Sequence, residues 1–143
     1  MIAVDTNILI YAHRAETQLH QICRTRLRDL AGSGDLWALP VFCIAEFVRV
    51  VTHLRVFSPP TELAVALEYL RRLLACPTVR VLCPGSAFPE LFETACQGAA
   101  VRGNLAFDAQ IVSVCREHGA DRILTADRDF ARFRGVEPEF IGG

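Results

Sequence analysis

The sequence predicts an α/β domain with a mostly parallel central sheet, and three observations lead to that class. Short apolar segments, such as residues 2–5 and 122–125, lack polar alternation, which is typical of strands covered on both faces. Amphipathic segments with a period near 3.6 residues separate them, and this alternation favours parallel pairing through helical crossovers. The 143 residues contain no repeat, low-complexity tract or linker, so we expect a single domain over residues 1–143.

The N-terminal half contains two predicted strands and three predicted helices. Thr6 and Asn7 offer a turn or a helix cap after the first strand, and Gly32 is a typical helix end. Pro40 ends the second strand, because proline cannot donate to a ladder. In order, we expect a strand at 2–5, a helix from about 8, a helix at about 17–31, a strand at 36–39 and a helix at about 41–54.

The C-terminal half continues the alternation. Pro59 and Pro60 mark the start of a helix whose apolar residues repeat with helical spacing. The remaining elements are a helix at 61–75, a strand at 79–82, helices at about 86–100 and 105–118, a strand at 122–125, a turn or short helix at 127–133 and an extended segment at 139–141. The leucines of the helix at 61–75 are candidates for partner contact, but we expect them to lie in the internal core. These leucines are Leu63, Leu67, Leu70 and Leu74.

The composition excludes several classes of protein. Hydrophobic residues make up 52% of the chain and the mean hydropathy is +0.29, which argues against disorder. No apolar run approaches the roughly 20 residues that a bilayer requires, and the N-terminus lacks a secretory signal. The six cysteines form no CxxC pair, so we expect reduced thiols rather than disulfides or a zinc site. The expected location is the cytoplasm, with no membrane association.

Arginine supplies all fifteen basic residues, although the net charge is only −1. Clusters occur around Arg26, at Arg71 and Arg72, and around Arg132. Solvated helix faces explain any one cluster. An arginine rim around an acidic site would also suit a phosphodiester substrate, because guanidinium groups bind phosphate through two hydrogen bonds.

Four acidic residues lie at the edges of apolar elements: Asp5, Glu46, Asp108 and Asp127. Carboxylates are rarely buried unless they are paired or bind a metal. Asp5 and Asp127 follow predicted strands, and functional sites of parallel sheets lie beyond the carboxyl ends of strands. Two carboxylates about 4 Å apart repel by roughly 4 kcal/mol at an effective dielectric near 20, so such a cluster holds protons or binds a cation. Oxygen ligands favour Mg²⁺, Mn²⁺ or Ca²⁺, which can activate a water for attack on phosphorus.

Each of these acids alone has a simpler structural explanation. Asp5 could cap the following helix, and Glu46 could pair with Arg49 one helical turn away. Asp108 could be an acid of a first helical turn, which the helix dipole stabilises, and Asp127 could close a turn. The four together, in this order, favour a shared site.

The segments around these acids resemble those of PIN-domain ribonucleases, and most of all the VapC toxins of toxin–antitoxin pairs. The resemblance covers residues 2 to 136 and is carried by four segments. These are Val4-Asp5-Thr6-Asn7-Ile8-Leu9, Glu46-Phe47-Val48-Arg49-Val50, Gly103-Asn104-Leu105-Ala106-Phe107-Asp108-Ala109 and Leu124-Thr125-Ala126-Asp127-Arg128-Asp129-Phe130. It implies a PIN-like three-layer α/β/α fold and an endoribonuclease dependent on Mg²⁺ or Mn²⁺. It also implies that the four acids ligate the metal, directly or through water, with Asp5 and Asp108 as the core ligands.

The resemblance assigns supporting roles to several polar neighbours. Thr125 would orient a carboxylate or a water, and Thr6 and Asn7 would support the loop of Asp5. Asp129 is either a further ligand or a cap of the turn before Phe130.

Two positions at the start of the helix at 105–118 affect the pocket. Asn104 either lines the site or serves as a polar N-cap. Phe107 stands where many relatives carry a polar residue, which alters the pocket wall.

The resemblance also implies the partners. They are an RNA substrate, a VapB-like antitoxin that inserts a segment over the acidic groove, and a second copy of the chain in a homodimer. The RNA target stays open among tRNA, rRNA and mRNA. A non-catalytic RNA-binding module is the alternative function. A phosphatase that forms an aspartyl-phosphate on Asp5 ranks lower, because Asn7 stands where such enzymes carry a second aspartate.

Overall fold

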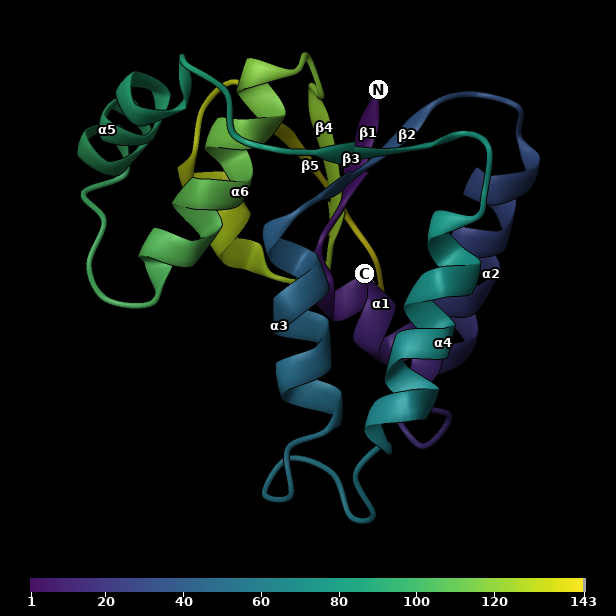
Figure 1. The fold of residues 1–143 in the computed structure, drawn as a ribbon. Coiled ribbons are helices and arrows are strands. Elements are labelled where there is room, and N and C mark those ends of the chain that lie inside the picture. Colours follow the sequence, from purple (N-terminus) through teal and green to yellow (C-terminus); the bar gives the residue numbers. More distant parts are fainter. Residues whose placement is uncertain (143) are drawn as a thin grey trace.

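The computed structural model describes residues 1–142, and its centre is a five-stranded sheet (Figure 1). Every pairing is parallel, and the strand order is β3-β2-β1-β4-β5. The strands are β1 (Ile2–Val4), β2 (Trp37–Pro40), β3 (Val79–Leu82), β4 (Arg122–Thr125) and β5 (Glu137–Phe140). The predicted α/β class with a parallel sheet is confirmed.

Helices cover both faces of this sheet. They are α1 (Thr6–His13), α2 (His20–Gly32), α3 (Phe42–Val51), α4 (Leu63–Leu74), α5 (Phe88–Gly98), α6 (Leu105–Glu117) and the short 3₁₀ helix η1 (Arg128–Arg132). In Figure 1, α5 and α6 lie on one side of the sheet, whereas α2 and α4 lie on the other. The arrangement is the expected three-layer α/β/α sandwich. Among the described residues, no helix combines the length and the apolar character needed to cross a membrane.

The central strands are continuous apolar runs because the hydrophobic core covers them on both faces. Both faces of β1 and β2 are covered, and every residue of these two strands is buried. Trp37, Phe47 and Phe130 are the largest fully buried side chains, and they come from β2, α3 and η1. One hydrophobic cluster therefore links elements from all parts of the sequence.

The strand order creates a crevice at the carboxyl ends of β1 and β4. From β1 the chain crosses to β2 on one side, and from β4 it crosses to β5 on the other. Connections that leave two neighbouring strands in opposite directions open a gap between them, where ligands of α/β sheets bind. Asp5 and Asp127 follow these two strands.

The structure corrects two predicted boundaries. Asp5 is the N-cap of α1, and Thr6 and Asn7 are already helical rather than capping residues. Pro40 belongs to β2 and stands opposite Leu82 of β3. The pairing of β2 with β1 ends at Ala38, so no ladder on that side requires an N–H from Pro40.

The expectation that the α4 leucines lie in the core is wrong for most of them. Leu70 is buried together with Ala66, but Leu63, Leu67 and Leu74 are exposed. The helix packs beside α3 at the outside of the helical layer, so a narrow stripe of its apolar surface suffices for contact.

Candidate active site

Asp5 is the most deeply placed carboxylate of the predicted set, with only 5% of its surface exposed. Its backbone N–H continues the sheet by donating to the Leu124 carbonyl at 3.0 Å. One carboxylate oxygen accepts the Thr6 N–H at 2.7 Å, and the other accepts the Thr125 hydroxyl at 2.8 Å. Each oxygen keeps a further lone pair for another partner.

Thr125 connects the two strand ends. Its buried hydroxyl donates to Asp5 and accepts the backbone N–H of Asp127 at 2.9 Å. One side chain thereby fixes the orientation of the Asp5 carboxylate and the path of the chain that carries Asp127.

Glu46 comes from α3 and is held at the wall of the same site. The Thr6 hydroxyl donates to its Oε2 at 3.1 Å, so the first helix links Asp5 to Glu46. Its Oε1 lies 3.9 Å from the Arg49 guanidinium, which is a loose contact between side chains that are 36% and 65% exposed. An exposed pair of this kind contributes little to stability.

Asp108, Asp127 and Asp129 form a close group of acids. Each of the three offers a carboxylate oxygen, and these oxygens lie within 4.8 Å of one another. Asp127 Oδ1 accepts the Asp129 N–H at 2.9 Å and caps η1, so the capping role that was open for Asp129 falls to Asp127. The turn of η1 brings the Asp129 carboxylate beside Asp108.

The two asparagines contribute less. Asn104 lies at the N-cap position of α6, but its side chain accepts no helix N–H. It is exposed and lines the pocket described below. Asn7 is half-buried in the first turn of α1, next to the Thr6 that contacts both Asp5 and Glu46.

Burial and mutual repulsion act on two of the carboxyls. Burial raises the pKa of Asp5 from 3.8 to about 7, and the nearby Glu46 and Asp127 add to this rise, whereas the hydrogen bonds from Thr125 and Thr6 oppose it. Burial also raises the pKa of Asp108 to about 7, with further contributions from Asp127, Asp5, Asp129 and Glu46. The five acids therefore influence one another as a single electrostatic group.

An open pocket of about 880 Å³ gives access to this group. Its wall carries Glu46, Asp108, Asp127 and Asp129, while Asp5 lies buried beneath. Other residues of the wall, such as Phe42, Gln110 and Arg49, were not predicted as site residues. Arg49 could have been predicted, because it lies one helical turn after Glu46. Nothing in the sequence beyond helical spacing marks Phe42 and Gln110 as site residues.

The donor set fits a hard divalent cation. All five acids offer oxygen, which Mg²⁺ and Mn²⁺ prefer. The acids raise one another's pKa: Glu46 and Asp127 act on Asp5, and Asp127, Asp5, Asp129 and Glu46 act on Asp108. A cation in the pocket would remove the cost of holding these groups ionised.

Comparison with protein families and curated relatives gives a consistent picture. The PIN domain family matches residues 2–136. Ribonuclease VapC43 of Mycobacterium tuberculosis is 39% identical over 134 residues, which cover 94% of this chain and 90% of that relative. Ribonuclease VapC25 of the same organism is 31% identical and covers 95% of each chain.

Solved structures share the fold. VapBC2 from Rickettsia felis, bound to a DNA fragment from their promoter, superimposes with a TM-score of 0.72 at 19% identity over 98% of each chain. VapC20 of Mycobacterium tuberculosis, a sarcin-ricin loop cleaving toxin, gives a TM-score of 0.64 at 19% identity and covers 96% of this chain and 100% of its own. At this level of identity the similarity concerns the fold alone.

Proposed function

The chain belongs to the PIN-domain family and is similar to its VapC ribonucleases, and on that premise we propose that it is a metal-dependent endoribonuclease that acts as a toxin. The observation that carries the proposal is the convergence of five carboxylates on one pocket. They come from the β1–α1 junction, α3, α6, the β4–η1 turn and η1, so distant parts of the fold contribute to one acidic site. Phosphodiester hydrolysis by a metal-activated water uses this kind of oxygen-rich site.

We propose different metal-binding roles for the acids according to how deeply each is buried. Asp5 and Asp108, whose ionisation is disfavoured in the metal-free protein, are the proposed core ligands of Mg²⁺ or Mn²⁺. Glu46, Asp127 and Asp129 offer oxygens closer to solvent, directly or through water. A divalent cation there would supply Lewis-acid chemistry, making a water more nucleophilic and offsetting the charge of the phosphodiester.

Positioning groups fix this arrangement before substrate arrives. Thr125 orients Asp5, and Thr6 holds Glu46 through its hydroxyl. Arg49 is exposed in the pocket wall and offers a guanidinium to the phosphodiester of the RNA. A preorganised site of this kind loses little free energy to rearrangement when the transition state forms.

The test is RNA cleavage by the purified protein and by Asp108→Asn. We expect the native chain to cut RNA with Mg²⁺ or Mn²⁺ and to stop when EDTA is added. Asp108→Asn should lose at least about a hundredfold in rate while keeping its circular dichroism spectrum, because one ligand is lost and no core contact changes. Full cleavage by Asp108→Asn would contradict the proposal.

Mapping the 5′ ends of cellular RNA after brief expression would identify the target. If the native protein binds RNA but leaves it intact with either ion, the non-catalytic RNA-binding module is the better description.

We also propose the partners that the family suggests. They are a VapB-like antitoxin whose segment covers the acidic groove and a second copy of the chain in a homodimer. The neighbour from Rickettsia felis is a VapBC2 assembly bound to promoter DNA, which supports a paired antitoxin for this chain. All six cysteines are free thiols, which suits action in the reducing cytoplasm.

A further inference from the structure

Phe107 is an aromatic side chain exposed inside the acidic pocket. It lies on α6 directly before Asp108, is 59% exposed and lines the pocket together with four acids. Its neighbours Leu105 and Ala109 are buried, so the helix directs Phe107 away from the core. Single exposed apolar residues are common, but this one stands next to a proposed metal ligand.

A second aromatic residue lines the pocket. It is Phe42 of α3, and its ring centroid lies 5.9 Å from that of Phe88 on α5. Phe88 in turn stacks on Phe92 with centroids 5.8 Å apart. This row holds Phe42 in place, whereas Phe107 makes no ring contact within residues 1–142 and keeps its face available.

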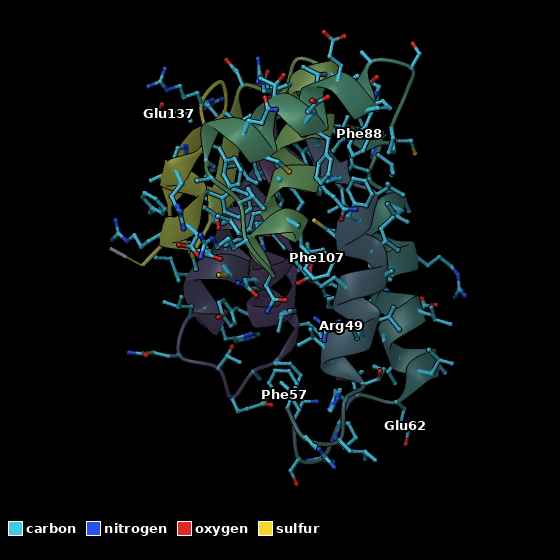
Figure 2. All side chains as sticks on the ribbon, turned by 90° about the vertical axis from the view of Figure 1, so that its left-hand side faces the viewer. Arg49, Phe57, Glu62, Phe88, Phe107 and Glu137 are labelled. Carbon is cyan, nitrogen blue, oxygen red and sulfur yellow. The ribbon has the colours of Figure 1, made fainter. Side chains whose placement is uncertain are left out.

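The charged groups beside Phe107 indicate what kind of planar ligand it meets. Arg49 lines the same pocket, and Figure 2 shows Phe107 on α6 and Arg49 on α3 on the same face of the molecule. A guanidinium can bind the phosphate of a nucleotide, and an exposed aromatic ring can stack on its base when that base is unpaired. The acids between them offer oxygens for the metal.

We propose that Phe107 is a specificity-determining residue on which an unpaired nucleobase next to the cleaved phosphodiester stacks. The inference rests on the proposed ribonuclease function and adds the requirement for an unpaired base at the cut. A base within a duplex is already stacked on its neighbours and is not free to contact Phe107.

The first experiment compares variants on a short oligonucleotide copied from a mapped cleavage site. Phe107→Ala and Phe107→Leu should raise KM by about tenfold or more with a smaller effect on kcat, which is the size of one lost base–aromatic stack. Phe107→Tyr should retain the native KM because it keeps the ring. Leu63→Ala is the matched control, since Leu63 is 57% exposed on α4 outside the pocket.

A binding experiment separates this proposal from the function on which it rests. The Asp108→Asn protein is mixed with the same RNA carrying 2-aminopurine beside the cut, and stacking should quench the fluorescence. Adding Phe107→Ala should abolish the quenching, and a duplex form of the RNA should show none in either protein. Failure of the native protein to cleave would overturn the ribonuclease function before any cut is mapped, whereas cleavage by the native protein without quenching in Asp108→Asn would overturn the stacking role alone.

An unchanged KM and unchanged quenching in Phe107→Ala would overturn the stacking role. Equal effects of Phe107→Leu and Phe107→Tyr would also overturn it, because ring loss would then have no special consequence. An apolar contact with a protein partner would be the remaining explanation for the exposed ring.

Discussion

At the scale of the residue, the structural and the chemical roles of the acids coexist. Asp5 caps α1, Glu46 lies near Arg49, Asp108 lies in the first turn of α6 and Asp127 caps η1. A carboxylate has more acceptor positions than a cap uses. Capping and pairing therefore orient these carboxylates, and each carboxylate still has acceptor positions for a shared ligand.

Thr125 offers a test of orientation at this scale. Thr125→Val keeps the shape but removes the donor to Asp5 and the acceptor for the Asp127 N–H. We expect weaker metal binding by about tenfold and a further rise of the Asp5 pKa, because that hydrogen bond favours the ionised carboxyl. Calorimetric titration with Mn²⁺ and the pH profile of cleavage would measure both effects.

Thr125→Ser is the control, since it retains the hydroxyl. Native metal affinity in Thr125→Val would show that the hydrogen bond has no positioning role.

At the scale of the element, α4 shows which structural features its sequence pattern predicts and which it does not. Its apolar spacing predicted a helix, which is confirmed, but spacing does not say how much of the apolar face a neighbour covers. The same applies to η1, where a 3₁₀ turn decides that Asp129 lies beside Asp108. Parallel strands share a common carboxyl edge, so Asp5 and Asp127 were predictable at the same edge, but their closeness also requires the pairing of β1 with β4, which the sequence did not show.

The two kinds of leucine on α4 make a direct comparison possible. Leu70→Ala should lower the free energy of unfolding by about 2–5 kcal/mol, because a buried side chain is lost and a cavity remains. Leu67→Ala should change it by less than about 1 kcal/mol, because Leu67 is exposed. Urea denaturation of both variants would check the difference, and equal losses would place Leu67 in a covered interface in solution.

At the scale of the whole molecule, the acidic site opposes folding when no metal is bound. The folded protein raises the pKa of Asp5 to about 7, whereas the unfolded chain releases the proton near 3.8. The folded state therefore holds more protons between these values, and stability falls as the pH rises from about 4 to above 7. Each unit of pKa difference corresponds to about 1.4 kcal/mol, and Asp108 adds a smaller part because it is only half-buried.

Melting temperatures in EDTA should consequently fall between pH 5 and pH 8 by at least about 5 °C. Asp5→Asn should flatten this dependence, and added Mg²⁺ or Mn²⁺ should restore the stability at pH 8 because only the folded state assembles the ligands. The same pH dependence in Asp5→Asn and in the native chain would contradict a raised pKa of Asp5.

The bridge from Thr125 to Asp5 has a consequence for the time at which the protein becomes active. It joins residues 120 positions apart, and Asp127 and Asp129 follow only after Thr125. During translation, Asp5 is therefore made more than 100 residues before Asp108, Asp127 and Asp129. The group of carboxylates cannot assemble until the segment with Asp127 and Asp129 has been synthesised and has folded against β1.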